Sequence, residues 1–440
     1  MNKPKNLIAL FSIIFLLNIL YTFFISPYGI HDIYGLKSKY SGQKYQEYIH
    51  ADARDYIYMG INIANGKGLS FPIENARSTA KRMPGYPLFL SGIFKLFGVD
   101  LEIALVVQCI LLTIFIFFSY MLAKELFSDK VAFISLLLIG ICPNIKFYGC
   151  AYLGSETLAG VFFLMFLYLF SKEFKNTVEL QQRVVSGSIL FALSVYIRPD
   201  FIIFVPFFIL WLLKKKKYLI KTLVSFLVIL LLSLSPWILR NYKLFNHFVP
   251  LTTAAGSVLA GSYNPDTIAY NPGGWDTFGL EKSEDINEVE ENQLKTEYAV
   301  EQMKSLNLAQ ITKLITWKMI RLWFPVQRVF RTNKGLVNVK ALLKGGKNLK
   351  GSLLMGCNIL FTLFFLPLYI FFWLGLVKLI REGRQMHLLI MLFFYMNSIA
   401  LVFWGSLRLR FIFEPMMIIS ACWYLIEKRN ERRRLAGNTL

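Results

Sequence analysis

Long apolar runs separated by short charged stretches dominate this chain, and the pattern predicts a bundle of membrane-spanning helices. A run of roughly 20 apolar residues can cross a bilayer as an α-helix. Two of the runs are short, so the turn between them at Arg198-Pro199-Asp200 is expected to join a tilted hairpin. The predicted spans lie at about 7–26, 101–123, 131–147, 157–170, 186–198, 201–213, 218–238, 353–379, 387–406 and 411–427.

These spans predict an all-α polytopic membrane protein with about ten transmembrane helices. One or two more spans have room between 306 and 345, which widens the expected number to roughly 10–13. The sequence shows no internal repeat and no separate soluble domain. Residues 1–440 are therefore interpreted as a single integral membrane domain, in which 351–440 forms the C-terminal transmembrane helices.

Cations beside the spans assign the two faces of the membrane. Lys3 and Lys5 precede the first span, Lys214–Lys217 follow the sixth, and the tail EKRNERRR follows the last. Because cytoplasmic loops carry an excess of Lys and Arg, both termini are expected on the inside of the cell (plasma or inner) membrane. This assignment makes 27–99 the first outer loop and 239–350 the long outer loop.

The two outer loops carry amphipathic patterns of their own. In 27–99, apolar and small residues recur at helical spacing after Ala51, which predicts amphipathic interfacial helices in this loop. The 239–350 loop holds Gly- and Pro-rich turns, the acidic patch EKSEDINEVEEN and a helical stretch near 306–323. That stretch mixes cations with Trp317 and Trp323, which suits a second interfacial position.

The composition supports a membrane protein and excludes other classes. Hydrophobic residues make up 55% and charged residues only 17% of the 440 positions, whereas about a quarter of a soluble domain is charged. A net charge of +21 can indicate nucleic-acid binding. Most clustered cations flank spans, however, so no nucleic-acid partner is expected. The five cysteines lack zinc-site spacing and are interpreted as packing residues.

Asp52 and Asp55 are the first candidates for chemistry, and two interpretations are open. Asp52 could cap the predicted helix, with Asp55 three residues later completing a pair like a capping box. Alternatively, Asp52 could be a general base or a metal-binding carboxylate that faces a cavity at the membrane surface. The two interpretations are compatible, because a capping acid can still face a cleft.

Two further acids lie at predicted outer ends of spans. Glu156 could belong to the first turn of a helix capped by Ser155. An ionisable group this close to the hydrocarbon needs a partner, which also makes Glu156 a candidate for the site. Asp200 has an easy local neutraliser in Arg198, two residues before it.

Cations on the outer side run against the usual charge bias and form a candidate phosphate-binding set. Snorkelling and stacking on aromatic rings are the ordinary explanation for each of them. Together they could hold a lipid phosphate by charge-assisted hydrogen bonds. The set is Arg54, Arg77, Lys81, Arg82, Arg198, Arg240, Arg408 and Arg410.

Short elements along 50–415 occur in an order that resembles the GT-C membrane glycosyltransferases. The resemblance is to the bacterial branch related to dolichyl-phosphate-mannose protein mannosyltransferases and the aminoarabinose transferase of lipid A. Gly60 stands where alanine is usual, and the turn at Gly261–Pro265 matches loosely. The matched positions are Asp52, Tyr56, Gly60, Asn62, Ile63, Gly66, Gly68, Arg82, Pro84–Phe89, Phe97, Gly98, Ser155, Glu156, Leu158, Arg198, Pro199, Pro236, Trp237, Arg240, Asn241, Gly256, Arg410, Phe411 and Pro415.

The resemblance implies a GT-C-like fold and an inverting glycosyltransferase that takes a sugar from a polyprenyl-phosphate donor on the outer face. It makes Asp52 the key catalytic carboxylate and Glu156 a second acid of the site, with Asp55 beside them and Tyr86 in the substrate-binding set. Glycosyl transfer needs a base for the acceptor hydroxyl and cations for the departing phosphate. An inverting displacement needs no covalent intermediate.

The expected partners are the polyprenyl-phosphate sugar, a glycan, lipid or protein acceptor, and membrane lipids. No cofactor is required by this chemistry. Asp52 and Asp55 are separated by two residues and do not form a DxD pair, which argues against an obligatory metal. Use of a divalent cation stays an open alternative.

Two other functions are compatible with the sequence. A transporter or flippase of lipid-linked sugars would more often show inverted repeats and broken helices with polar residues at mid-membrane. A non-catalytic membrane subunit would use Asp52 and Glu156 only as helix caps. Replacing Asp52 by Asn separates the capping interpretation from the base interpretation, because Asn caps as well as Asp.

Overall fold

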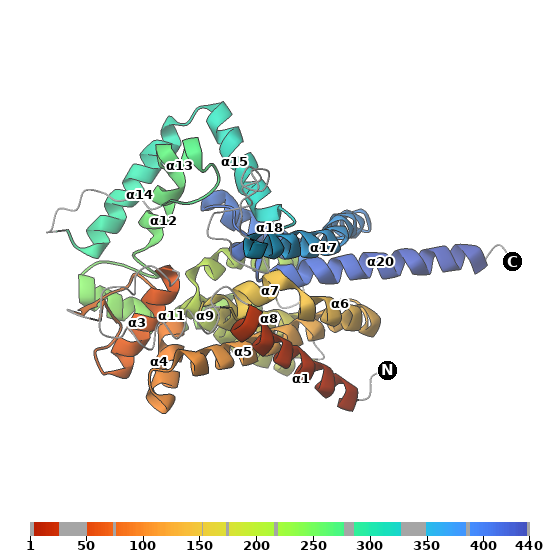
Figure 1. Cartoon of the computed structure of the whole chain (residues 1–440). Coiled ribbons are helices and arrows are strands. Elements are labelled where there is room, and N and C mark those ends of the chain that lie inside the picture. The colour runs from red at the N-terminus through yellow and green to blue at the C-terminus, as the bar shows by residue number, and fades with distance from the viewer. Residues whose placement is uncertain are drawn as a thin grey trace.

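The structure is a computed structural model, and helices make up most of it (Figure 1). The only sheet among the described residues is an antiparallel pair, β1 (Ser70–Phe71) and β2 (Arg77–Ser78). The all-α prediction is confirmed. The described residues are 4–25, 51–73, 76–151, 153–172, 176–214, 219–276, 286–326, 349–383 and 388–437.

Every predicted span falls on helical structure. The span predicted at 7–26 is α1 followed by a π-helical turn, Tyr21–Ile25, and the span at 201–213 begins with a 3₁₀ turn, Pro199–Phe204. The bundle helices are α1 (Pro4–Leu20), α5 (Leu101–Leu126), α6 (Asp129–Ile141), α7 (Pro143–Gly149), α8 (Glu156–Ser171), α9 (Thr177–Ile197), α10 (Val205–Lys214), α11 (Leu219–Phe245), α17 (Leu349–Arg381), α18 (Leu388–Val402) and α20 (Glu414–Gly437).

By length and apolarity, fewer helices qualify as membrane spans than the roughly ten that the sequence predicts. Five described helices are long and apolar enough to cross a bilayer, or six if the bent pair α6 and α7 is counted as one span. Shorter apolar helices include α8, α18 and the segment Pro199–Leu213. The chain is thus an integral membrane protein, and the number of about ten spans stays a prediction, as does any span at 327–345, which lies outside the described residues.

The segment predicted as one span at 131–147 is broken. Its two helices, α6 and α7, meet at an angle of 63°. Cys142 between them has extended dihedrals, φ −65° and ψ 117°, because the residue before a proline is disfavoured in the helical region. Pro143 then starts α7, where its missing N–H costs no helical hydrogen bond.

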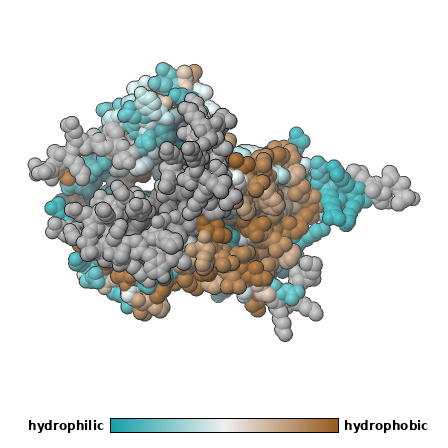
Figure 2. All heavy atoms as spheres, viewed as in Figure 1, coloured by the Kyte–Doolittle hydropathy of each residue, from teal (hydrophilic) through white to brown (hydrophobic). Residues whose placement is uncertain are grey.

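Both chain ends lie at the same end of the bundle (Figure 1). The last turns of α20, rich in Lys and Arg, project beyond the body there and are hydrophilic, whereas the body beside them is largely hydrophobic (Figure 2). The loop elements described below gather toward the opposite end of the bundle.

The predicted helices of the two loops are present. The 27–99 loop forms α3 (Ala51–Ala64) and α4 (Gly85–Phe97), which pack against each other. The apolar face of α3 is buried in this packing, at Ile57, Met59 and Ile61, and is not free to lie on lipid. In the 239–350 loop the helices are α12 (Ala255–Tyr263), α13 (Pro265–Tyr270), α14 (Glu288–Ser305) and α15 (Leu308–Trp323).

A cluster of buried aromatic rings fixes the helices beneath the loops. Phe163 and Phe166 of α8 contact Phe191 of α9 and Phe204 of the 3₁₀ turn, with ring centroids 5.1 to 6.4 Å apart. Buried aromatic pairs contribute about 0.5–1.5 kcal/mol each beyond the area they bury. The start of α8 and the end of α9 are thereby held next to each other, and each carries a charged residue of the site.

Candidate functional site

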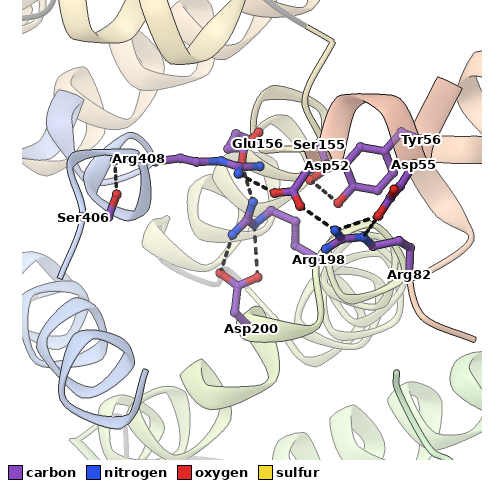
Figure 3. A network of polar contacts seen from close by, with 10 residues as sticks. All are labelled: Asp52, Asp55, Tyr56, Arg82, Ser155, Glu156, Arg198, Asp200, Ser406 and Arg408. Atoms are coloured by element: carbon purple, nitrogen blue, oxygen red, sulfur yellow. Dashed lines mark hydrogen bonds and ion pairs between the residues drawn. The ribbon is translucent and has the colours of Figure 1, made fainter. Parts of the chain in front are cut away.

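Asp52 lies where three separate parts of the chain meet (Figure 3). Its Oδ1 accepts a hydrogen bond from Arg82 Nη2 at 2.5 Å, and its Oδ2 accepts one from Arg408 Nη1 at 2.5 Å. Asp52 is the second residue of α3 and so lies in its first turn rather than at the N-cap. A first-turn acid is still favourable to the helix dipole, but here both carboxylate oxygens are also engaged by guanidinium groups.

Glu156 is the buried centre of the same cluster, with its side chain 1% exposed. Its Oε1 accepts hydrogen bonds from Arg408 Nε at 2.5 Å and from Arg198 Nη1 at 2.6 Å. Arg408 therefore bridges Asp52 and Glu156 through two different nitrogens. A charge at the start of an apolar helix needs such partners, and the sequence-based expectation of a partner for Glu156 agrees with this geometry.

The predicted capping role of Ser155 is wrong. Ser155 has helical dihedrals, φ −74° and ψ −11°, and its side chain makes no capping hydrogen bond. Its hydroxyl instead lies 3.2 Å from the hydroxyl of Tyr56. Burial raises the pKa of Tyr56, which keeps that phenol protonated at neutral pH. Tyr56 thus ties α3 to the start of α8 through neutral groups.

Arg198 and Arg82 are each shared between two acids. Arg198 donates to both oxygens of Asp200, at 3.1 and 3.2 Å, in addition to Glu156. Arg82 donates from Nε and Nη2 to Asp55 Oδ2, at 3.2 and 2.9 Å, in addition to Asp52. Burial lowers the pKa of Arg82, but the charges of Asp52 and Asp55 outweigh that effect, so its pKa is raised and it stays a cation.

The acids and cations of the cluster nearly balance. Four carboxylates, Asp52, Asp55, Glu156 and Asp200, face the guanidiniums of Arg82, Arg198 and Arg408. A fourth cation, Arg54, lies 3.7 Å from Asp55. Exposure is uneven: the side chains of Asp52 and Arg82 are 24% and 23% exposed, whereas Glu156 is 1% exposed. The side of the cluster that carries Asp52 and Arg82 is therefore the more exposed one.

Local structure explains why Arg408 reaches this cluster and Arg410 does not. Both belong to the one-turn helix α19 (Leu407–Arg410), which Ser406 caps by accepting a hydrogen bond from the Arg408 amide. Residues two apart on a helix point to different sides. Arg410 is fully buried, and it donates to Glu414 Oε2 and to the Tyr369 hydroxyl, both at 2.6 Å. Arg410 is a core residue, so the structure does not support its predicted phosphate contact.

The other predicted cations also lie outside the cluster. Arg240 donates to the carbonyls of Thr79 and Leu69, at 2.9 and 3.3 Å, and its guanidinium stands over the Trp237 ring. Arg77 and Lys81 are exposed. Tyr86 is buried and donates to Gln108 Oε1 at 3.3 Å, while its ring meets the Tyr56 ring edge to face. The hydrogen bonds that Arg240 and Tyr86 donate go to groups other than Asp52.

Sequence reasoning gave no site role to three residues that the cluster contains. Asp200 was set aside as the local partner of Arg198, yet it shares that arginine with Glu156. Tyr56 and Ser155 belong to the matched elements, and their hydroxyls meet across the two segments. The signal that could have found them is the occurrence of both in the same elements as Asp52 and Glu156.

No group of three or more side chains able to hold a metal ion occurs among the described residues. The cluster offers carboxylate oxygens, which hard divalent cations prefer. Both oxygens of Asp52, Oδ2 of Asp55 and Oε1 of Glu156 are already bonded to guanidinium groups. Use of a divalent cation by this site stays an open alternative.

Comparisons with known proteins show what the chain is similar to. A family profile described as Dolichyl-phosphate-mannose-protein mannosyltransferase matches residues 81–239. The matched segment contains Arg82, Glu156 and Arg198, while Asp52 and Arg408 lie on either side of it. The search of curated proteins gave no match.

Solved structures share the fold across nearly the whole chain. The apo form of the Archaeoglobus fulgidus oligosaccharyltransferase has a TM-score of 0.55 and 14% identity, covering 98% of this chain and 52% of that chain. The archaeal oligosaccharyltransferase AglB from Archaeoglobus fulgidus, in complex with an inhibitory peptide and a dolichol-phosphate, has a TM-score of 0.52 and 13% identity, with the same coverage of 98% and 52%. This chain spans about half the length of the structures it matches.

A more distant match is ArnT from Cupriavidus metallidurans bound to undecaprenyl phosphate, with a TM-score of 0.42, 11% identity and coverage of 95% of this chain and 76% of that chain. The profile match and the fold shared with the oligosaccharyltransferase confirm the resemblance to the GT-C membrane glycosyltransferases that the sequence elements predicted.

Proposed function

We propose that the protein is an inverting glycosyltransferase that moves a sugar from a polyprenyl-phosphate donor to a hydroxyl-bearing acceptor on the outer face of the membrane. The observation that carries the proposal is the position of Asp52. It is a partly exposed carboxylate at the accessible side of a buried arginine cluster, at the end of the bundle away from both termini. A base next to several guanidiniums is what transfer from a sugar phosphate requires.

The bonds can be followed through one displacement. The acceptor oxygen forms a bond to the anomeric carbon while the bond from that carbon to the phosphate oxygen breaks. The departing phosphate keeps the bonding electron pair and is stabilised by guanidinium groups. The acceptor proton passes to a carboxylate oxygen of Asp52. The leaving group is already a good one, so no acid catalyst is needed.

Arg82 and Arg408 are the cations proposed to bind the donor phosphate. In the structure they hold Asp52 itself, one on each oxygen. A donor phosphate offers the same two guanidiniums more acceptor oxygens, so it can replace Asp52 as their partner. That exchange places the phosphate on the cations and leaves an Asp52 oxygen available for the acceptor hydroxyl. Binding of the donor phosphate therefore also releases Asp52 from its arginine partners.

Glu156 is proposed as a positioning residue rather than the base. Its side chain is 1% exposed and accepts from Arg198 and Arg408 together. Buried between them, it orients Arg408 toward Asp52 and the phosphate. Asp200 does the same for Arg198 through a two-point contact.

The proposal is tested by measuring release of polyprenyl phosphate from a panel of polyprenyl-phosphate sugars, by the protein in native membranes. Wild type is expected to release the carrier from one donor, and the variant Asp52→Asn is expected to release none at equal expression. Asp129→Asn is a matched control, because Asp129 is an exposed first-turn acid of α6 that pairs with Lys124 away from the cluster.

Movement of a lipid-linked sugar across the bilayer without release of carrier would contradict the proposal and favour a transporter. Equal release by wild type and Asp52→Asn would remove Asp52 from the mechanism. The donor that wild type accepts identifies the sugar.

A further inference from the structure

The segment 79–82, which carries Arg82 into the cluster, is held by contacts from three other elements. Arg240 of α11 donates to the Thr79 carbonyl at 2.9 Å. The Thr253 amide donates to the Ala80 carbonyl at 3.1 Å. The third element is α14, through its first residue, Glu288.

Glu288 accepts hydrogen bonds on both carboxylate oxygens. Its Oε1 receives the Ala80 amide at 2.7 Å and the Thr253 hydroxyl at 2.9 Å. Its Oε2 receives the Thr79 hydroxyl at 2.8 Å. The Thr79 hydroxyl oxygen in turn accepts from the Lys81 amide at 3.0 Å. One carboxylate from the 239–350 loop therefore organises the two residues that come just before Lys81 and Arg82.

The neighbouring acids of α14 have other roles. Glu290 completes a capping box with Asn287, and Glu291 forms an ion pair with Lys295 on the same helix. Because Asn287 and Glu290 satisfy the helix start, Glu288 is left to reach across to the 27–99 loop. Among the three acids of this first turn, Glu288 is the one that the structure bonds to that loop.

The helix that carries Glu288 is itself fixed in place. The Gly256 amide of α12 donates to Asn292 Oδ1 of α14 at 2.7 Å. A Cβ added at Gly256 would lie 2.1 Å from the Asn292 carbonyl oxygen, so the two backbones approach as closely as glycine allows. α12 follows directly after Thr253, which also bonds Glu288 and Ala80. Residues 253–256 and α14 thus form one unit against the arginine segment.

We propose that Glu288 is a positioning residue for Arg82: it couples the 239–350 loop to the cluster and sets the place from which Arg82 reaches Asp52 and the donor phosphate. This inference rests on the proposed function for its catalytic consequence, but not for the contact itself. Hydrogen bonds to a charged group are stronger than those between neutral groups, so their loss is expected to loosen the segment that they hold.

The first test measures the coupling without activity. Hydrogen exchange is followed in the full-length protein in lipid nanodiscs, in the peptide that covers 77–83. Glu288→Ala is expected to speed exchange of the Ala80 and Lys81 amides. The control Glu297→Ala removes an exposed acid of the same helix and is expected to leave that peptide unchanged. Unchanged exchange in Glu288→Ala would overturn the proposal.

The second test is a double-mutant cycle on donor turnover. Glu288→Ala is expected to lower turnover about tenfold in the wild-type background, the effect of losing one hydrogen bond to a charge. In the Arg82→Ala background it is expected to have almost no further effect, because its target is gone. Multiplicative losses in the two backgrounds would mean that Glu288 acts elsewhere, and would also overturn the proposal.

The two tests separate failure of this inference from failure of the proposed function. If no donor is turned over by wild type, the proposed function fails, and the exchange result alone decides whether Glu288 fixes the Arg82 segment. If wild type is active and exchange in 77–83 does not respond to Glu288→Ala, only the Glu288 inference fails.

Discussion

Arg408 and Arg410 are two residues apart on the same short helix, and each is paired with acids, yet their surroundings differ. Arg408 is 16% exposed and bridges Asp52, itself 24% exposed, and Glu156. Arg410 is 0% exposed and pairs with Glu414 four residues on and with the Tyr369 hydroxyl. One arginine is partly exposed to solvent, and the other is enclosed in the core.

This difference in exposure distinguishes an ion pair that can take part in binding from one that stabilises the fold. A fully buried ion pair has no alternative partners and stabilises the folded structure as it is, because removing one partner leaves an unpaired buried charge. A partly exposed arginine can exchange its carboxylate for another anion at little cost. The account therefore assigns stability to Arg410 and phosphate binding to Arg408, and variants can be chosen to break that assignment.

The largest expected effect is on stability. Arg410→Ala leaves Glu414 buried without its guanidinium and is expected to cost about 3–5 kcal/mol. The measurement is the thermal midpoint of the detergent-solubilised protein, followed by tryptophan fluorescence. Should that variant not accumulate, the double variant Arg410→Met with Glu414→Leu is expected to recover folded protein, since it removes both charges. A wild-type midpoint for Arg410→Ala would contradict the assignment.

The next effect is on activity. Arg408→Lys keeps the positive charge but loses the fork that bridges Asp52 and Glu156, and transfer is expected to fall about 100-fold. The thermal midpoint is expected to stay close to that of wild type, because Asp52 is partly exposed and the buried Glu156 keeps the guanidinium of Arg198 as a partner. Full activity in this variant, measured as carrier release, would show that the bridge is not used.

Lys318 extends the comparison to a buried cation held by neutral groups. It lies on α15, where its Nζ donates to the Tyr263 hydroxyl at 2.7 Å and to the Leu401 carbonyl at 2.9 Å. Burial lowers its pKa from the ordinary 10.5 to about 7. Between these pH values the unfolded state binds more protons than the folded state, so stability is expected to rise with pH from about 7 to 10.5.

The variant Lys318→Met tests that expectation. Its thermal midpoint is expected to change less between pH 7 and pH 10 than the midpoint of wild type. Parallel midpoint curves for the two proteins across this range would mean that Lys318 is not the group responsible. Arg410 gives no such slope, because its acids keep it charged throughout.

The smallest expected effects are at the exposed cations of the 27–99 loop. Arg77→Ala and Lys81→Ala are expected to change carrier release by no more than about twofold, because exposed charges contribute little. A large loss of carrier release in either variant would indicate that the donor phosphate binds near β2 and not at the arginine cluster.

The sequence could predict much of this site, because the relevant residues stand at helix ends. Asp52, Glu156 and Arg198 occur where apolar runs begin or stop, and the fold brings those ends together. Arg82 and Arg408 were grouped as candidates for phosphate binding, and the structure brings their side chains to Asp52. Their pairing with particular acids could not be predicted, since it depends on tertiary packing.

The errors have local physical causes. Arg410 was grouped with Arg408 because both stand at a predicted outer end of a span, whereas a helical turn sends their side chains to different sides. Glu414, four residues after Arg410, was a visible sign of a local ion pair. Pro143 was likewise a visible sign of the helix break at Cys142, but the continuous hydrophobic run led to the prediction of a single span there.

The central claim is that Asp52 is the base of a glycosyl transfer, and a single-turnover measurement tests it most directly. Purified wild type and Asp52→Asn are loaded with the donor that the panel identifies, and bound donor and released carrier are followed separately. The account predicts that the variant still binds the donor, through Arg82 and Arg408, and transfers nothing. Transfer by Asp52→Asn at the wild-type rate would contradict it.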